Sequence, residues 1–220
     1  MAYKLLIEEA NQDLEFIKEE KNLNEPATLY IKGPYMKCET VNKNMRIYTK
    51  EDMYREVDRY IKEMVNTKRA LGEIEHPQTP EVSLDRAAHL IVSLEKVGNE
   101  IIGKSKVLTT PMGNIARCLI SDGASIGMSS RALGRLTMES GNVNRVNDMR
   151  LCAVDIVSDP SAGSFVGAIL ESKQYIITPD GKYAEAYEVF ESALSSLPRK
   201  DVQSYLTEQI QRFLGQLGKK

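Results

Sequence analysis

The segment AHLIVSLEKVGNEIIGKSKVL, residues 88–108, is the part of the sequence that decides the fold class. Two runs rich in β-forming residues flank Gly98-Asn99, a dipeptide suited to a two-residue hairpin turn. A helix over residues 83–94 is the competing interpretation, and we favour the hairpin because a second β-like run follows the turn. The first run alternates, and the apolar residues expected on one face are Leu90, Val92 and Leu94.

Further strands are predicted on both sides of this hairpin. Residues 28–32 are rich in β-formers, and we expect Gly33-Pro34 to end that strand. Residues 35–41 are expected to form a second strand. Two longer strands, joined by a polar Ser-Gly-Asn turn, are predicted over residues 125–136 and 145–157.

Two helices are indicated by their capping residues. Thr49 stands three residues before Asp52, the spacing of a capping box. The apolar face that follows at helical steps comprises Met53, Val57, Tyr60, Ile61, Met64 and Val65. A second helix is expected to begin at Thr110-Pro111 and to end at Asp122-Gly123. The residues of this second helix expected to face the core are Ile115, Leu119 and Ile120.

The chain divides into three predicted segments. Residues 1–25 are charged and loosely amphipathic, and we predict an N-terminal arm whose pattern allows a helix. Residues 26–171 are expected to form the central domain, and residues 172–220 a separable helical tail. The apolar positions of its two predicted helices are Tyr183, Tyr187, Phe190 and Leu194, followed by Val202, Leu206, Ile210, Phe213 and Leu217.

Composition limits the function classes. The 220 residues carry a net charge of −2, which argues against a nucleic-acid-binding surface. No apolar run is long enough to span a membrane, so we expect no membrane partner. Three scattered cysteines do not form a disulfide framework. These features predict a soluble, intracellular globular protein.

The remaining chemistry-bearing residues suggest a serine nucleophile. Phosphate-binding glycine loops are absent, and the two histidines lack metal-ligand spacing, so we expect neither cofactor nor metal. Ser129 and Ser130 lie on a predicted strand, and a serine hydroxyl needs a base to become nucleophilic. His76, in a proline-stiffened loop, is the candidate base, and Asp155 is the candidate group to orient it. From the residues alone, a surface Ser-Ser pair and an exposed loop histidine are the favoured interpretation, and the triad is the alternative.

Four sequence blocks resemble one protein family. They are RALGEIEHP at 69–77, GMSSRALG at 127–134, VNKNMRIY at 41–48, and VDIV with PSA between residues 154 and 162. In their order along the chain they are similar to the prohead maturation proteases of T-even-like tailed phages, over residues 28–171. That family is related to the herpesvirus assemblins. The resemblance implies an α+β fold, a mostly antiparallel β-barrel surrounded by helices.

The resemblance implies roles for individual residues. Ser129 would be the nucleophile, His76 the general base and Asp155 the third member. Assemblins have histidine at the third position, so His89 stays open as the alternative. Ser130 and Cys152 are the other candidate nucleophiles. Arg131 is open between holding the oxyanion and pairing with a surface carboxylate, and residues 158–164 are candidates for oxyanion amides.

Proteases of this family are similar in cutting after Glu in Ile/Leu-x-Glu sites. A basic or amide-rich pocket must then bind that carboxylate. The candidate pocket residues are Arg117, Arg131, Arg135 and Lys104. Such sites occur in this chain at Leu6-Ile7-Glu8, Ile169-Leu170-Glu171 and, within a predicted helix, Leu206-Thr207-Glu208. We predict self-cleavage after Glu171, which would remove the tail.

The resemblance also implies partners and location. The expected substrates are phage scaffold or core proteins and capsid proteins, inside the assembling prohead in the host cytoplasm. The tail helices are candidates for docking to the scaffold core, and a homo-oligomer stays open. The alternative function is a non-enzymatic scaffold or core protein. An esterase is disfavoured because the chain lacks the G-x-S-x-G motif.

Overall fold

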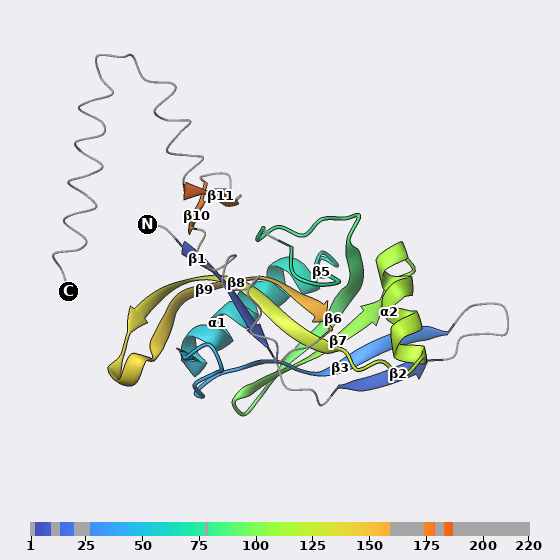
Figure 1. The fold of residues 1–220 in the computed structure, drawn as a ribbon, viewed down its shortest axis with the longest axis horizontal. Coiled ribbons are helices and arrows are strands. Elements are labelled where there is room, and N and C mark those ends of the chain that lie inside the picture. Colours follow the sequence, from blue (N-terminus) through green and yellow to red (C-terminus); the bar gives the residue numbers. More distant parts are fainter. Residues whose placement is uncertain are drawn as a thin grey trace, which may run out of the picture. The chain divides into compact units, whose positions relative to one another are not determined.

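The computed structural model describes residues 3–9, 14–19, 27–77, 79–158, 174–178 and 183–186. The chain forms two compact units, one of residues 1–173 and one of residues 174–220 (Figure 1). The secondary structure is mixed α+β and mostly sheet, as predicted. The predicted division into arm, domain and tail remains a prediction.

The first sheet of the larger unit carries the two longest strands. Its strands lie in the order β1 (Tyr3–Glu9), β8 (Gly127–Met138), β9 (Asn144–Val157) and β4 (Arg46–Tyr48). β1 and β9 each run antiparallel to β8, and β4 runs parallel to β9. The two long strands are the predicted ones. The helix allowed in the first 25 residues is wrong, because Leu5 and Leu6 are fully buried in a strand.

The second sheet contains the predicted hairpin. Its order is β2 (Glu15–Glu19), β3 (Thr28–Lys37), β7 (Glu100–Val107), β6 (Ala87–Val97) and β5 (Leu71–Glu73), all antiparallel. Gly98 takes the positive φ of 60° that the turn requires. The prediction that Gly33-Pro34 ends a strand is wrong. β3 passes through both residues, and the ladder accommodates them with a bulge after Pro34.

The buried face of β6 differs from the predicted one. His89 and Ile91 point into the core, whereas Val92 is 40% exposed. A register shift between Ile91 and Ser93 then returns Leu94 to the buried face. The simple alternation failed because a bulge inserts one residue and reverses the faces beyond it.

The described strands form two sheets and not the closed barrel implied by the resemblance. The sheets meet at one isolated parallel bridge between Ile74 and Ile156. β5 contains three residues, and the chain leaves the ladder at Glu75, which has a positive φ of 58°. The seam at this bridge positions the site described below. A common core of buried side chains from both sheets and α1 includes Leu6, Ile31, Val57, Ile91, Met128 and Ile156.

Two helices flank the sheets, at the predicted places (Figure 1). α1 (Lys50–Tyr60) is capped by the Thr49 hydroxyl, which accepts from the Asp52 amide, and continues as a π-helical turn (Ile61–Val65). α2 (Pro111–Ser121) is capped by Thr110. Its buried face is Gly113 and Ala116, and the prediction for its core face is wrong in that Ile115 and Leu119 are 47% and 42% exposed. Small residues are needed there because a Cβ at Gly113 would lie 2.2 Å from the Leu108 carbonyl oxygen.

The smaller unit is described only in part. β10 (Gln174–Ile177) and β11 (Tyr183–Glu185) pair antiparallel. Tyr183, expected to begin a helix, therefore lies in a strand, and the rest of the predicted tail helices lies outside the described residues. No helix in the described part of the chain has the length and apolar character needed to cross a membrane.

Candidate active site

Three predicted residues meet at the seam between the two sheets. The His76 Nε2 atom lies 2.8 Å from the Ser129 Oγ, and the His76 Nδ1 atom lies 2.8 Å from the Asp155 Oδ2. An ionised carboxylate only accepts hydrogen bonds, so Nδ1 carries the proton and Nε2 accepts from the Ser129 hydroxyl. Hydroxyl, imidazole and carboxylate therefore form a continuous chain of hydrogen bonds across two strands and a loop.

Asp155 is fully buried on β9 yet is held in its charged form. Burial opposes ionisation, but the hydrogen bond from His76 and the charge of Arg131 outweigh it and lower the pKa from 3.8 to about 2. The Glu73 backbone amide donates a further hydrogen bond of 3.0 Å to Oδ1. The carboxylate is thus a permanent negative charge beneath the imidazole at neutral pH.

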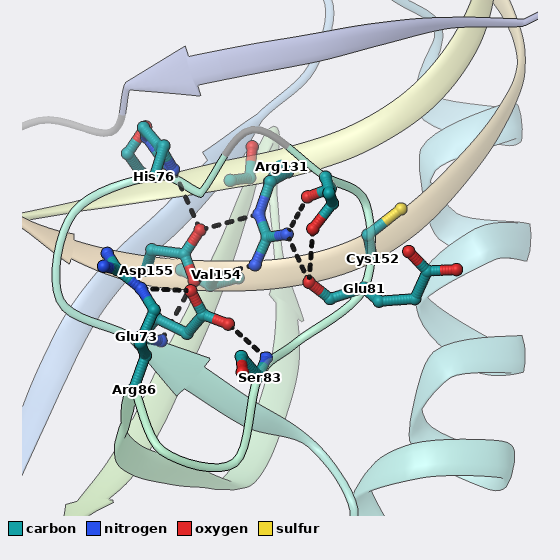
Figure 2. A network of polar contacts seen from close by, with 12 residues as sticks. Glu73, His76, Glu81, Ser83, Arg86, Arg131, Cys152, Val154 and Asp155 are labelled. Carbon is teal, nitrogen blue, oxygen red and sulfur yellow. Dashed lines mark hydrogen bonds and ion pairs between the residues drawn. The ribbon is translucent and has the colours of Figure 1, made fainter. Parts of the chain in front are cut away.

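Arg131 neutralises that buried charge and binds the loop above it. Its Nε lies 2.9 Å from the Asp155 Oδ2, and both side chains are fully buried. Its Nη1 donates to the carbonyl oxygens of Thr79 and Glu81. Figure 2 shows bonds from His76 and Arg131 converging on Asp155, with the loop wrapped around the guanidinium. Arg131 is therefore neither an oxyanion donor nor a surface ion pair, because its described hydrogen bonds are directed at Asp155 and this loop.

The loop that carries His76 is anchored at both ends. Before it, the buried Glu73 carboxylate accepts from the Ser83 amide and pairs with Arg86 at 3.3 Å. Arg86 also donates to the Ile74 carbonyl oxygen at 2.8 Å. The Glu75 amide donates to the Ile156 carbonyl oxygen at 2.8 Å, which fixes the loop to β9 one residue before His76. These contacts fix the backbone on either side of the imidazole, and Figure 2 shows those among Glu73, Ser83 and Arg86.

Ser129 and Ser130 are both buried on β8, and they differ in their relation to His76. The Ser129 hydroxyl lies against the imidazole, whereas the described partner of the Ser130 Oγ is the Glu8 carbonyl oxygen, at 3.4 Å. The Ser129 Oγ also lies 3.1 Å from that same carbonyl oxygen. Of the two hydroxyls, the geometry favours Ser129 as the one a histidine base can deprotonate.

His89 lies on the other side of β5, away from the hydroxyl. Its Nε2 donates to the Val154 carbonyl oxygen at 2.9 Å, and its ring is fully buried. Burial lowers its pKa from 6.5 to about 4, only partly offset by the charge of Asp155. His89 is therefore neutral at pH 7 and bound to backbone. The geometry thus brings Asp155, and not His89, to His76.

The other candidate residues have different surroundings. Cys152 is buried, and its thiol lies 3.5 Å from the Arg150 carbonyl oxygen. Lys104 pairs with Glu19, Arg135 pairs with Asp148, and Arg117 donates to the Ala27 carbonyl oxygen. Among the described residues there is no cluster of three or more His, Cys, Asp or Glu side chains that could hold a metal ion. Residues 159–164 of the proposed oxyanion loop lie outside the described residues.

Comparison with known proteins assigns the family. The family model described as prohead core protein serine protease matches residues 8–174, most of the chain. The chain belongs to this family. This protease is therefore a serine peptidase of the kind that acts in phage capsid assembly, and the non-enzymatic alternative is disfavoured.

Two relatives support the assignment. The prohead core protein protease of Enterobacteria phage T4 is 37% identical over 146 residues, which are 64% of this chain and 69% of the relative. The solved structure of the bacteriophage T4 capsid assembly protease superimposes with a TM-score of 0.68 at 34% identity. The match covers 72% of this chain and 99% of that one. The fold therefore agrees with that of the T4 protease.

Several residues that build the site escaped the sequence-based prediction. Glu73 and Arg86, which anchor the loop, carry no motif of their own. The buried Glu8, on β1, binds Asn42, Asn44, Arg46 and Tyr48 through its carboxylate. A signal for this last group was present, because residues 42, 44, 46 and 48 alternate and would share one face of a strand.

Proposed function

We propose that Ser129, His76 and Asp155 are the catalytic residues of this protease, and that it is a serine endopeptidase. The observation that supports this is the chain of two 2.8 Å hydrogen bonds linking the hydroxyl, the imidazole and the buried carboxylate. A hydroxyl, a base and an orienting carboxylate in this arrangement are the recurring machinery of acyl transfer.

Each group has a defined part in the reaction. His76 Nε2 takes the proton of Ser129 as Oγ attacks the peptide carbonyl, and then returns it to the leaving amine. Asp155 holds Nδ1–H, fixes the tautomer and stabilises the imidazolium that forms. Arg131 and the Glu73 amide keep Asp155 ionised, so they act as positioning groups and not as catalytic residues.

The substrates that fit this protease are proteins of the phage prohead. By analogy with the T4 relative, named as a prohead core protein protease, it acts on scaffold or core and capsid proteins inside the assembling prohead of an infected cell. It cleaves after glutamate in Ile/Leu-x-Glu sites. We assign the protease domain to residues 26–171 and a helical tail to residues 172–220.

Hydrolysis of matched peptides tests the catalytic assignment. Ser129→Ala is expected to reduce kcat/KM on a Leu-Ile-Glu peptide by at least about 10⁴-fold, because the nucleophile is lost. The matched variant Ser130→Ala, one residue away on the same strand, is expected to retain activity within about tenfold, because its hydroxyl does not contact His76. If Ser130→Ala abolishes cleavage and Ser129→Ala does not, the assignment is wrong.

Self-processing is tested separately by intact-mass analysis over time. The purified chain is expected to lose residues 172–220 by cleavage after Glu171, while the Ser129→Ala chain stays whole. A Glu171→Gln chain should keep its tail and still hydrolyse the peptide. A Ser129→Ala chain trimmed at the wild-type rate would show that another protease makes the cut.

A further inference from the structure

The Glu8 side chain occupies a built carboxylate pocket beside the proposed nucleophile. Its Oε1 lies 3.0 Å from the Arg46 Nη1 and 2.6 Å from the Tyr48 hydroxyl. Its Oε2 lies 2.5 Å from the Asn42 Nδ2 and 2.9 Å from the Asn44 Nδ2. The Arg46 and Glu8 side chains are only 7% and 11% exposed. One cation and three neutral donors thus enclose a single carboxylate, a pattern that selects glutamate over an uncharged side chain.

The main chain of the same residue lies at Ser129. The Glu8 carbonyl oxygen is 3.1 Å from the Ser129 Oγ, and β1 pairs antiparallel with β8 so that Glu8 and Glu9 stand opposite Ser130 and Ser129. The peptide bond after Glu8 therefore lies beside the hydroxyl that His76 activates. A substrate strand would hold its scissile bond at this position, and attack then requires the Glu8 carbonyl carbon to turn toward the Ser129 Oγ, from which its oxygen now accepts a hydrogen bond.

A second contact lies two residues earlier on β1. Leu6 and Glu8 share one face of the strand, because side chains alternate. Leu6 is fully buried over Gly134, where a Cβ would lie 2.7 Å from the Leu6 Cδ1 and 2.8 Å from the Val146 Cγ1. The absence of a side chain at residue 134 thus makes a hollow for an aliphatic group. Leu6, Ile7 and Glu8 match an Ile/Leu-x-Glu sequence with each specified residue in its own pocket.

We propose that β1 occupies the substrate groove of its own protease. Asn42, Asn44, Arg46 and Tyr48 form the pocket for the glutamate that precedes the scissile bond, and Gly134 with Val146 forms the pocket for the aliphatic residue two positions before it. The inference rests on the proposed function, since it takes Ser129 as the nucleophile. β1 then competes with protein substrates, and the resting chain is inhibited until this strand is displaced or cut.

The cut itself balances as an ordinary acyl transfer. Ser129 Oγ bonds to the Glu8 carbonyl carbon, its proton passes through His76 to the nitrogen of Glu9, and the Glu8–Glu9 bond breaks. Water then hydrolyses the Glu8 ester, which restores the Ser129 hydroxyl and leaves a new carboxylate on Glu8. Residues 1–8 are thereby separated from the rest of the chain, and the groove becomes accessible to substrates.

Selectivity between two peptides tests the pocket. The full-length chain is offered Leu-Ile-Glu and Leu-Ile-Gln peptides with the same fluorogenic leaving group, and competition by β1 lowers both rates equally. We expect a preference for glutamate of about 10²-fold or more, because the buried cation is left unpaired by glutamine. Arg46→Gln should remove most of that preference. The preference is measured as the ratio of the two rates, because weaker docking of β1 in this variant raises both rates alike and leaves the ratio unaffected.

The control is Arg145→Gln, an exposed arginine on the strand next to β4 that pairs with Glu139. It should leave the preference unchanged. Should Arg46→Gln fold poorly, Tyr48→Phe removes one donor at constant shape and should lower the preference about tenfold. Equal losses on both peptides in these variants would overturn the pocket.

Occupancy of the groove is tested at Glu8. Glu8→Gln weakens the docking of β1 and should raise the initial rate of peptide hydrolysis by about tenfold, because charge-assisted hydrogen bonds are lost. Intact mass should show that the bond after residue 8 is cut in the wild type and spared in the variant. The matched control, Glu15→Gln on the exposed strand β2, should change neither the initial rate of peptide hydrolysis nor the cleavage after residue 8. An unchanged or reduced initial rate in Glu8→Gln would overturn the occupancy.

Failure of this inference is distinguishable from failure of the proposed function. A fluorophosphonate probe reports the activated nucleophile once β1 is displaced or cut, and it needs neither the glutamate pocket nor the aliphatic pocket. If the probe labels Ser129 but the Glu8 and Arg46 variants behave as the wild type, the inference alone is wrong. If the probe does not label Ser129 even in Glu8→Gln, the proposed function fails first.

Discussion

Asp155 shows how one buried residue couples stability to chemistry. A carboxylate taken out of water normally becomes neutral, and this one stays charged because Arg131, His76 and the Glu73 amide all donate to it. The same contacts that offset the cost of burial also fix the imidazole tautomer. Removing the charge should therefore affect both folding and catalysis.

Replacement of the carboxylate by an amide separates the two effects. Asp155→Asn is expected to lower kcat by about 10⁴-fold, because the amide no longer requires Nδ1 to carry the proton. It should also destabilise the fold by about 3 kcal/mol, because Arg131 is left buried without a counter-charge. Peptide hydrolysis and urea unfolding measure the two losses. A variant with wild-type kcat would exclude Asp155 from the catalytic group.

Acid should destabilise the fold in two successive ranges. In the folded protein the pKa of His89 is lowered from 6.5 to about 4. Its contribution to the free energy of unfolding is therefore complete above pH 6.5 and is lost as the pH falls to 4. The folded pKa of Asp155 is depressed from 3.8 to about 2, so a further contribution of about 2 kcal/mol is lost between those values. Urea unfolding from pH 7 to pH 2 measures both. A His89→Gln chain whose stability still falls between pH 6.5 and 4 as in the wild type would contradict the first range.

The three-residue strand β5 is the element on which the site depends. It passes between β6 and β9 so closely that a Cβ at Gly72 would lie 2.1 Å from both the His89 Nε2 and the Val154 carbonyl oxygen. The absence of a side chain permits the His89–Val154 hydrogen bond beside it and keeps Glu73 within reach of Asp155. The loop bearing His76 then starts from a fixed point.

Adding one methyl group to this strand tests its role. Gly72→Ala is expected to destabilise the protein by about 3 kcal/mol, because fixed neighbours must move apart. It should also reduce kcat, because β5 carries the loop of His76. Gly98→Ala, in the open hairpin turn, adds the same group where no atom lies within 4 Å and should cost about 1 kcal/mol through its positive φ alone. Equal costs measured by urea unfolding would contradict the close packing.

Elements with strong local signals were predictable, and those set by tertiary contacts were not. The Gly98-Asn99 turn and the Thr49 and Thr110 caps specify their structures locally, so the hairpin and both helices were found. The sequence of β1 predicts a charged arm because Glu8 and Glu9 follow its apolar residues. Glu8 is buried there because side chains of residues 42–48, distant in sequence, bind its carboxylate. The bulge in β6 depends on its partner strand and leaves no trace in the alternation.

The meeting of the three proposed site residues could be predicted from the sequence, but the contacts that support them could not. His76, Ser129 and Asp155 were identified because few groups in the chain can do acid–base chemistry and because their blocks resemble one family. Arg131 was assigned to other roles, since its sequence position does not reveal that it lies under a loop from the other sheet. The contacts that position a catalytic group cross between elements and are specified only by the fold.

At the scale of the larger unit, Arg131 joins the two sheets. It projects from β8 in the first sheet, pairs with β9, and binds the loop that leaves the second sheet after β5. One backbone bridge, between Ile74 and Ile156, pairs the two sheets, and the Arg131 contacts lie beside it. Arg131 thus adds to the Glu73–Asp155 and Glu75–Ile156 hydrogen bonds that hold the loop of His76 near Ser129.

Loss of that contact should open the seam locally. Arg131→Gln is expected to destabilise the unit by about 3 to 5 kcal/mol, because Asp155 loses its buried counter-charge. Hydrogen exchange should accelerate most at residues 74–83, the loop that the guanidinium binds. Arg135→Gln breaks an exposed pair with Asp148 and should change stability by less than about 1 kcal/mol. Unchanged exchange in that loop would show that Arg131 does not position it.

Chemical labelling of the Glu8→Gln chain, in which the docking of β1 is weakened, measures the activated hydroxyl itself. A fluorophosphonate is expected to modify Ser129, as found by peptide mapping, and His76→Ala in an otherwise folded chain should abolish the modification while Ser130→Ala preserves it. Modification of a different residue, or labelling of Ser129 that persists without the imidazole, would contradict the assignment of His76 as its base.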